Sequence, residues 1–372
     1  MHRVALFVPS LVAGGAERVM LRLADTLGRM QGVEVDLVVT RCEGTLVPEV
    51  PEHVSLFELG SGRTVLAVPA LVRYLRARRP EALLCTMLGA IGAGIVAGSV
   101  ARTGARIIAR QPNLFGRQFL GEAHAGNLVA RIGGWLLPRW LRRADSVIAV
   151  SDDVYDEILA CGVEASRVHC IPNPLPMAWV RGQAAAPLDH PWLGAEADIP
   201  VIVAAGRMVR QKGYASLLDA VACCNEHRPL RCIILGDGVL RPVLESRCHE
   251  LGLDDRVDMP GVMTNPYRYF ARADVYVSSS AWEGMPNVIL EALACGAPVV
   301  ATDCPGGSRQ VLTSVHAGRL VAVDDAKGMA AAIHDVLKDR ASFVANTDAL
   351  AEHYGDITVA RRYLDVMLVS SD

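Results

Sequence analysis

Two cations in the second half of the chain could hold a diphosphate. Arg207 and Lys212 stand five residues apart, directly after an apolar run of the kind that forms a buried strand. Open parallel sheets bind their ligands at the carboxyl ends of strands, and an arginine can grip two phosphate oxygens at once. A salt bridge with a purely structural purpose is the alternative interpretation of these cations.

Two glutamates eight residues apart form the second candidate group. We expect Glu283 in a loop and Glu291 in a short apolar helix, which has Pro286 in its first turn and Gly296 as its C-terminal cap. A buried carboxylate needs hydrogen-bond donors, and the hydroxyls of a sugar or a ribose are suitable. The N-terminus of the helix also favours an anion nearby.

A pair of glycines near the start of the chain could form a third contact with a ligand. Gly14 and Gly15 follow the first apolar run and open the first helix, where free N–H groups attract anions. The pattern lacks Gly-x-Gly-x-x-Gly, and no acid ends the second strand, so it does not indicate a dinucleotide site. A plain tight turn explains these glycines equally well.

The elements that must position these residues alternate between strand and helix, which predicts an α/β fold with parallel sheets. We expect strands at 3–8, 33–39, 82–86, 106–109, 146–150, 199–205, 230–235, 257–259, 275–278, 298–302 and 319–323. The alternation breaks at 171–176, and a stretch rich in Ala, Pro and Asp follows at 184–200. We therefore expect an N-terminal domain at 1–178, a C-terminal domain at 179–350 and a helix within 351–372 that packs back on the first domain.

The composition is that of a globular protein: 372 residues, of which 51% are apolar, suffice for two cores. The ten cysteines lack zinc spacing and fit a reducing cytoplasm. The apolar start resembles a signal peptide, but Glu17 and Arg18 soon afterwards favour a strand. The uncharged run 82–101 is long enough for a membrane span, yet its glycines favour a strand followed by a helix.

Positive charge is concentrated in one part of the chain. Between Arg63 and Arg143 thirteen arginines stand against only Glu81 and Glu122. Such a concentration predicts an anionic partner, unless the arginines are scattered over solvated helix faces. The stretch 129–143 mixes Trp and Leu with Arg, which is typical of a membrane interface. Because no nucleic-acid motif accompanies it, we expect the region 102–143 to contact an anionic membrane and not nucleic acid.

The motifs together resemble the family 4 retaining glycosyltransferases, which have the GT-B fold of two Rossmann-like domains facing a cleft. The resemblance rests on Gly206-Arg207, Lys212-Gly213 and the Glu283-x₇-Glu291 pattern. Segments 14–18, 150–151 and 171–174 match the family in the same order, so the resemblance covers nearly the whole chain.

The resemblance implies a role for each residue. Arg207 and Lys212 would hold the donor diphosphate, Glu283 would contact the transferred sugar, and Glu291 the ribose. Further donor-binding positions would be Gly14, Gly15, Gly206, Gly236, Pro260, Val262, Gly284, Met285 and Asn287. No metal and no cofactor is implied, because cations and helix dipoles serve in their place and no Asp-x-Asp is present.

The chain departs from the family at two places. Gln310 stands where a glutamate near the nucleotide is common, and 109–113 lacks a histidine that many members carry. His124 is the nearest candidate acceptor-side base, and a surface histidine is the alternative interpretation.

The donor and the acceptor are also expectations. The loop 304–307 is similar to that of transferases that use UDP-N-acetylhexosamines, while UDP-hexoses and GDP-mannose stay open. We expect a saccharide acceptor, lipid-linked, at the inner face of the cytoplasmic membrane. A sugar-nucleotide 2-epimerase and a non-catalytic nucleotide-sugar binder are the rival functions, and a nicotinamide oxidoreductase is disfavoured.

Overall fold

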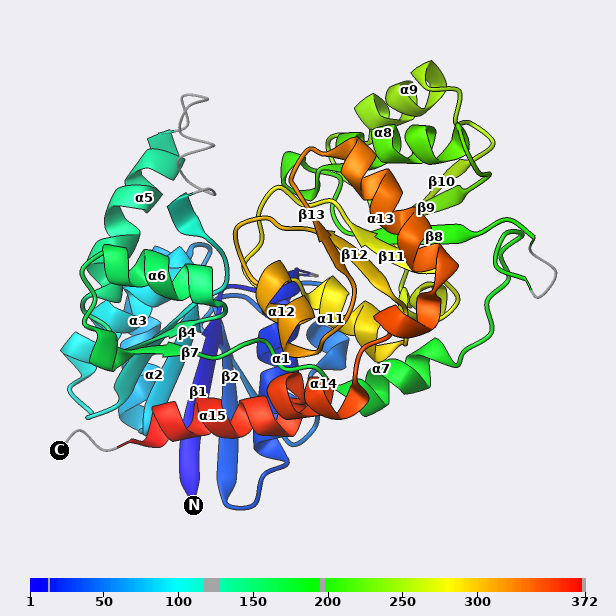
Figure 1. Cartoon of the computed structure of the whole chain (residues 1–372). Helices are drawn as coiled ribbons and strands as arrows, with labels where there is room; N and C mark the ends of the chain where they lie inside the picture. Colours follow the sequence, from blue (N-terminus) through cyan, green and yellow to red (C-terminus); the bar gives the residue numbers. More distant parts are fainter. Residues whose placement is uncertain (13, 117–127, 195–197, 370–372) are drawn as a thin grey trace. The chain divides into compact units, whose positions relative to one another are not determined.

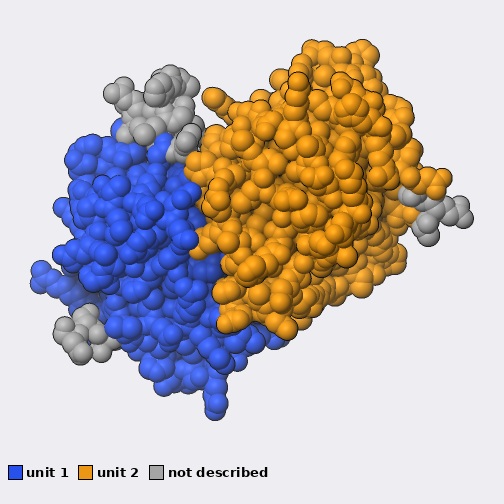
Figure 2. Space-filling view, in the orientation of Figure 1, with its two compact units in different colours: residues 1–174, 354–372 blue, residues 175–353 orange. Residues whose placement is uncertain are grey.

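The chain folds into two compact units. The computed structural model describes residues 1–12, 14–116, 128–194 and 198–369, with the side chains of 128–131 excepted (Figure 1). Unit 1 consists of residues 1–174 and 354–372, and unit 2 of residues 175–353 (Figure 2). The boundaries expected from the sequence, after 178 and 350, differ from these by a few residues.

Unit 1 is built on a seven-stranded parallel sheet with the order β3-β2-β1-β4-β5-β6-β7. Its strands are β1 (His2–Val8), β2 (Val33–Val39), β3 (Ser55–Glu58), β4 (Ala82–Thr86), β5 (Arg106–Gln111), β6 (Ser146–Ala149) and β7 (Val168–Cys170). Its α-helices include α1 (Gly15–Gly28), α2 (Val68–Arg78), α3 (Leu88–Ala101), α5 (Leu128–Leu141), α6 (Asp152–Ala160) and α15 (Asp356–Leu368). The 3₁₀ turns η1 (Val47–Glu49), η2 (Thr64–Ala67) and η4 (Ala165–Arg167) join them. The first six strands follow the Rossmann order.

The last helix of the chain completes the core of unit 1. In α15, the apolar residues recur at helical spacing, and Val359, Tyr363 and Met367 are completely buried. They belong to the same hydrophobic cluster as β1, β2 and the buried face of α1, against which α15 packs. A segment that follows unit 2 in the sequence thus closes the core that the first strand begins.

Arginines from the basic region help to hold this arrangement. Arg110 on β5 is completely buried, and it donates hydrogen bonds to Tyr363 Oη (3.0 Å), Thr86 Oγ1 (3.3 Å) and Asn173 Oδ1. Arg106 donates to Ser146 Oγ (3.0 Å) and to a backbone carbonyl just after α15. The interpretation of the thirteen arginines as one basic face is therefore wrong for Arg110, because its charge lies inside the unit.

Unit 2 repeats the Rossmann order in a six-stranded parallel sheet, β10-β9-β8-β11-β12-β13. The strands are β8 (Val201–Ala205), β9 (Arg231–Leu235), β10 (Val257–Gly261), β11 (Val275–Ser278), β12 (Val299–Thr302) and β13 (Arg319–Val321). The helices and turns are α7 (Met177–Ala184), η5 (Arg210–Lys212), α8 (Tyr214–Asn225), α9 (Arg241–Glu250), α10 (Tyr267–Phe270), α11 (Asn287–Ala294), α12 (Ser308–Ser314), α13 (Ala326–Lys338), η6 (Arg340–Phe343) and α14 (Thr347–Tyr354). The predicted α/β class with two parallel-sheet domains is confirmed.

The uncharged run at 82–101 contains strand β4 and helix α3, as its glycines indicated. Gly94 shows why a small residue is needed: a Cβ built there would lie 2.4 Å from Cys85 Sγ on β4. In the described part of the chain, no helix is both long and apolar enough to cross a bilayer.

Candidate functional site

The site begins at the carboxyl end of β8, where two glycines let neighbouring loops approach closely. Gly206 has a φ of +152°, and a Cβ built on it would lie 3.0 Å from both Lys212 Cε and Tyr214 Oη. Gly213 has a φ of +60°, and a Cβ there would lie 2.1 Å from the carbonyl oxygen of Ser279. The loop that carries Lys212 is therefore packed directly on the loop that carries Glu283.

Lys212 and Glu283 form a buried ion pair. Lys212 Nζ lies 2.6 Å from Glu283 Oε1, and the two side chains are 17% and 7% exposed. Ser280 Oγ donates to the same carboxylate oxygen at 2.6 Å, whereas Gln211 Nε2 lies 3.5 Å from Oε2. The salt-bridge alternative thus holds for Lys212, and its partner is the glutamate predicted to bind the sugar.

A second loop fixes the backbone around Glu283. The amide of Glu283 donates to the carbonyl of Pro305 (2.9 Å), and the amide of Gly307 donates to the carbonyl of Gly284 (2.8 Å). Gly306 has a φ of +119°, and a Cβ there would lie 2.4 Å from the carbonyl oxygen of Glu283. The predicted donor-binding residues Gly284 and Met285 are buried beneath this loop.

Helix α11 starts at Asn287 and carries Glu291 in its second turn. Pro286 is the residue before the helix, one position earlier than expected, while Gly296, with a φ of +81°, follows its end as predicted. Glu291 is 8% exposed, and its Oε1 accepts a hydrogen bond from Tyr267 Oη at 3.2 Å. The buried carboxylate therefore has the hydrogen-bond partner that its burial required, supplied by α10.

Three further predicted positions line up along the carboxyl edge of the sheet. A Cβ on Gly236, after β9, would lie 2.0 Å from the carbonyl oxygen of Gly206, and its amide donates to the carbonyl of Gly261 at 2.8 Å. Pro260 and Gly261 are the last two residues of β10, and Val262 just beyond the strand is 74% exposed. Gly206, Gly236 and 260–262 thus lie at the carboxyl ends of three adjacent strands.

Arg207 stands apart from this packing. Its side chain is exposed, and within the described ranges the guanidinium makes no hydrogen bond or ion pair. The loop after β8 consequently offers Arg207 as an uncommitted cation beside Lys212, which is paired with Glu283.

Several residues around these positions were not found by sequence reasoning. Ser280 lies three residues before Glu283, so the short spacing could have indicated it. Tyr267 lies 24 residues before Glu291 and gave no signal. The Tyr214 hydroxyl is buried and has no hydrogen-bond partner among the described residues. Its burial is the main cause that raises its pKa above the usual value, and the nearby Glu283 charge is the second cause.

Other predicted residues lie elsewhere. Gly14 precedes α1 in unit 1 and Gly15 begins it, and a Cβ on Gly14 would meet the Glu17 carboxylate, so an anionic group of the chain already lies at this helix N-terminus. Gln310 lies in the first turn of α12 and is half-buried. His124 falls outside the described residues.

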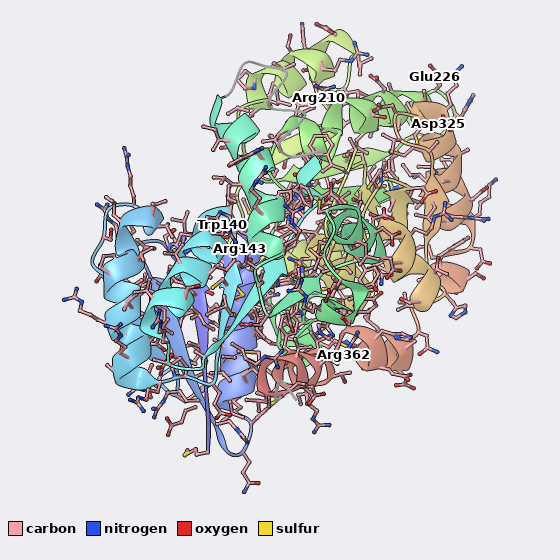
Figure 3. All side chains as sticks on the ribbon, turned by 90° about the vertical axis from the view of Figure 1, so that its left-hand side faces the viewer. Trp140, Arg143, Arg210, Glu226, Asp325 and Arg362 are labelled. Carbon is pink, nitrogen blue, oxygen red and sulfur yellow. The ribbon has the colours of Figure 1, made fainter. Side chains whose placement is uncertain are left out.

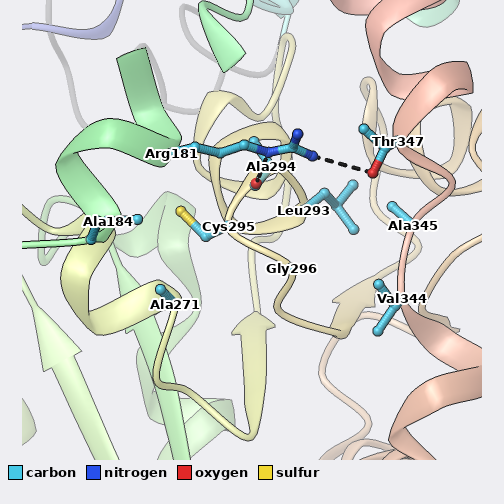
Figure 4. Close-up of a pocket in the computed structure, with 11 residues that line it drawn as sticks. Arg181, Ala184, Ala271, Leu293, Ala294, Cys295, Gly296, Val344, Ala345 and Thr347 are labelled. Atoms are coloured by element: carbon cyan, nitrogen blue, oxygen red, sulfur yellow. Dashed lines mark hydrogen bonds between the residues drawn. The ribbon is translucent and has the colours of Figure 1, made fainter. Parts of the chain in front are cut away.

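A hollow of about 370 Å³ lies at the other end of α11 (Figure 4). Arg181 crosses it, donating to the carbonyl of Ala294 (3.0 Å) and to Thr347 Oγ1 (3.2 Å). Arg181 therefore stabilises the C-terminus of α11, and no predicted site residue lines the hollow. Among the described residues, no group of three His, Cys, Asp or Glu side chains could hold a metal ion.

Known protein families match both halves of the chain. Residues 13–178 match the family described as Glycosyltransferase Family 4, and residues 199–339 match Glycosyl transferases group 1. Each half of the chain thus matches a model of glycosyltransferase domains.

Several curated relatives are named as glycosyltransferases. The chain is 32% identical over 170 residues to the N-acetylgalactosamine-N,N'-diacetylbacillosaminyl-diphospho-undecaprenol 4-alpha-N-acetylgalactosaminyltransferase of Campylobacter jejuni, a match that covers 45% of this chain and 46% of the relative. It is 33% identical over 193 residues to the lipopolysaccharide core biosynthesis glycosyltransferase LpsD of Rhizobium meliloti, covering 50% and 55%. The chain thus spans about half the length of these relatives.

Solved structures match the fold over the whole length. Anabaena Alr3699/HepE in complex with UDP-glucose superimposes with a TM-score of 0.79 at 19% identity, covering 99% of both chains. The sucrose-phosphate synthase of Thermosynechococcus elongatus superimposes with a TM-score of 0.76 at 21% identity, covering 98% of both. These likenesses confirm the GT-B fold.

Proposed function

We propose that this protein is a retaining glycosyltransferase that moves a sugar from a nucleotide-sugar donor to a saccharide acceptor. The observation that carries the proposal is the arrangement after β8, where exposed Arg207 and the Lys212–Glu283 pair stand at the carboxyl edge of the sheet, beside the N-terminus of α11. This edge is where open α/β sheets bind ligands, and its groups suit a phosphorylated sugar.

The cations would act on the leaving group. When the bond between the sugar and the diphosphate breaks, negative charge grows on the departing nucleotide, and groups already aimed at that charge lower the barrier. Arg207 would bind the diphosphate directly. Lys212 Nζ, which lies 2.6 Å from Glu283 Oε1, would turn from the carboxylate towards the diphosphate. The proposed chemistry needs no metal and no cofactor, because these cations and the α11 N-terminus neutralise the charge.

The glutamates would orient the donor. Glu283 Oε1 is held by Lys212 and Ser280, whereas Oε2 has the long contact with Gln211, so Oε2 would accept a bond from a sugar hydroxyl. Glu291, whose Oε1 accepts from Tyr267, would accept hydrogen bonds from the ribose hydroxyls. Retention would follow from attack by the acceptor on the same face as the leaving group, which requires no protein nucleophile.

The donor base and sugar extend this proposal. Gly236, Pro260 and Val262 would flank the base, for which we propose uracil, with an N-acetylhexosamine or a hexose as the sugar. The solved structure of Anabaena Alr3699/HepE holds UDP-glucose, and the Campylobacter relative is named for the transfer of N-acetylgalactosamine. The first supports a UDP-sugar donor, and the second supports an N-acetylhexosamine as the sugar.

The acceptor would be a lipid-linked saccharide in the assembly of a cell-surface glycan or glycolipid. The Campylobacter relative is named for a diphospho-undecaprenol acceptor, and the Rhizobium relatives for the lipopolysaccharide core. Such an acceptor would place the protein at the inner face of the cytoplasmic membrane.

Nucleotide binding tests the site. We expect UDP, and not GDP, ADP, dTDP or NAD, to raise the melting temperature of the wild type. Because a hydrogen bond to a charged group contributes about 1.5–3 kcal/mol, Glu291→Gln should weaken UDP binding by roughly 10- to 100-fold. Glu352→Gln, a change at an exposed glutamate on α14, is the matched control and should bind UDP normally.

Stabilisation by NAD alone, or by none of these nucleotides, would overturn the assignment of the site. Incubating the protein with a UDP-sugar and no acceptor tests the reaction class. Conversion of the donor into its epimer would replace the transferase proposal by a 2-epimerase.

A further inference from the structure

Glu291 has a tyrosine from a neighbouring helix beside it. Tyr267, the first residue of α10, is 3% exposed, and its Oη donates a hydrogen bond to Glu291 Oε1 at 3.2 Å. The residues that flank Glu291 on α11, 288–290 and 292–294, are apolar. A carboxylate buried in apolar surroundings is stable only where hydrogen-bond donors reach it. Tyr267 therefore holds one oxygen of this carboxylate from outside its own helix.

Other aromatic rings fix the ring of Tyr267. The ring of Trp179 on α7 meets it edge to face, with the ring centroids 5.3 Å apart and the planes at 78°. Phe270 meets it in the same way, with the centroids 6.1 Å apart and the planes at 86°. Phe270 packs in turn on Tyr276 of β11, at 5.1 Å. Aromatic pairs favour this edge-to-face geometry, so the Tyr267 hydroxyl projects from a ring that packing holds in place.

The backbone around Tyr267 is also tied down. Helix α10 packs against both α7 and α11, and α7 packs against α11 as well. Arg268 on α10 donates to the carbonyl of Pro187 (3.1 Å), and Arg272 just after the helix donates to the carbonyl of Ala186 (3.2 Å). Both carbonyls belong to the segment that follows α7. The tyrosine is therefore fixed relative to α7 by its backbone as well as by its ring.

We propose that Tyr267 is a positioning residue of the donor site, whose hydroxyl holds the Glu291 carboxylate in the orientation that accepts hydrogen bonds from the donor ribose. The inference rests on the proposed function, in which Glu291 binds the ribose. The terminal torsion of a glutamate has a broad energy minimum, so an untethered carboxylate must be ordered when a ligand binds. A hydrogen bond made before the ligand arrives removes part of that cost, because the group is already oriented.

The ribose is then the part of the nucleotide on which Tyr267 acts. A site built around a buried acceptor rejects a ligand that lacks the matching hydroxyl, because the acceptor is left without a partner. Tyr267 should therefore strengthen the preference for nucleotides with ribose hydroxyls over nucleotides without them. Binding of the base and of the diphosphate should not depend on it, since neither contacts Glu291 in the proposed site.

Calorimetric titration of the full chain tests the inference without an acceptor. The ligands are UDP and 2′,3′-dideoxyuridine diphosphate, which lacks both ribose hydroxyls. We expect the wild type to bind UDP about tenfold more tightly, or better. Tyr267→Phe keeps the ring and removes only the hydroxyl. It should weaken binding of UDP by roughly five- to tenfold and binding of the dideoxy nucleotide by less than about twofold, so that most of the preference is lost.

Tyr269→Phe is the matched control. Tyr269 also lies on α10 and is 5% exposed, but its hydroxyl contacts Met263 Sδ at 3.5 Å and no carboxylate. This variant should bind both nucleotides like the wild type. If Tyr267→Phe weakens binding of the two nucleotides equally, the hydroxyl serves only the packing of unit 2, and the inference is overturned.

A double-variant cycle shows whether the tyrosine acts through Glu291. In a Glu291→Leu background Tyr267→Phe should not weaken UDP binding any further, because the carboxylate that it positions is gone. In a Glu226→Leu background it should have its full effect, since Glu226 is an exposed carboxylate at the end of α8 (Figure 3). A full effect of Tyr267→Phe in the Glu291→Leu background would refute the inference.

The same titrations separate this inference from the proposed function. Failure of UDP to bind the wild type would count against the proposed function itself. Binding of UDP that Glu291→Leu weakens and Tyr267→Phe leaves intact would overturn only the inference. Equal affinity of the wild type for UDP and the dideoxy nucleotide would also overturn it, because the ribose would then make no contact for Tyr267 to position.

Discussion

Burial of the Glu283 or the Lys212 charge alone would cost much free energy, whereas the two charges can be buried together as an ion pair. An ionised carboxylate in a protein interior requires a partner, and here a lysine and a serine hydroxyl bind the same oxygen. The residue types and their separations along the chain predicted both members as site residues. Their pairing was not predictable, because it joins positions 71 residues apart, and the local pattern says nothing about which loops meet.

Breaking this pair tests its strength at the level of single residues. Lys212→Met leaves the carboxylate buried with the weaker partners Ser280 and Gln211, which should lower the free energy of unfolding by about 3 kcal/mol. Adding Glu283→Gln removes the stranded charge, so the double variant should be more stable than Lys212→Met alone. Urea unfolding followed by tryptophan fluorescence measures both effects, and Trp282 next to Glu283 contributes to the signal.

Lys338→Met is the control for this series. Its lysine pairs with Asp335 at 3.8 Å while 73% exposed, and breaking so exposed a pair should change stability by less than about 1 kcal/mol. Strictly additive effects of Lys212→Met and Glu283→Gln would show that the pair is not energetically coupled.

At the level of elements, the apolar strands within the sheets were predictable from the sequence, whereas the short strands at the sheet edges were not. Strands 33–39, 82–86 and 275–278 have the expected bounds, because most residues of each are apolar and buried within a sheet. Strands β3 and β7 were missed. β3 forms one edge of the sheet and β7 the other. They have only four and three residues, and most of these are not fully buried, so neither strand shows a clear apolar pattern in the sequence.

The loop after β12 shows how one element positions another. Gly306 has a left-handed backbone, and the Cβ of an alanine there would meet the Glu283 carbonyl oxygen at 2.4 Å. Gly306→Ala should therefore displace the Glu283–Met285 backbone and abolish the thermal stabilisation by UDP. Gly296→Ala is the matched control, because that glycine also has a positive φ but open space around it. It should cost only the backbone strain, about 1–2 kcal/mol, and keep the UDP effect. A retained UDP shift in Gly306→Ala would show that this loop does not set the site.

For the whole molecule, the assignment of α15 to unit 1 has an energetic consequence. Five of its side chains are buried in the unit 1 core: Val359, Ala360, Tyr363, Val366 and Met367. The larger side chains each contribute roughly 1.5–3 kcal/mol on burial, so their sum rivals the whole stability of a typical domain, about 5–15 kcal/mol.

Removal of residues 355–372 should therefore unfold unit 1 and leave unit 2 folded. Calorimetry of the shortened chain should show one of the wild-type transitions lost, and limited proteolysis should leave a fragment close to 175–353. Ile357→Ala, at a residue of α15 that is 55% exposed, is the control and should keep both transitions. Survival of unit 1 without α15 would contradict the core described above.

The tie between the first strand and the last helix also sets an order of events during synthesis. The ribosome must add the 179 residues of unit 2 between the two parts of unit 1. At 5–20 residues per second this takes roughly 10–40 s, during which the sheet of unit 1 is already made but its α15-facing apolar surface is uncovered. During the same interval Arg110 lacks its hydrogen bond to the Tyr363 hydroxyl. The nascent chain should therefore expose a chaperone-binding surface until its final helix emerges, and the domain whose synthesis begins first is the last to be completed.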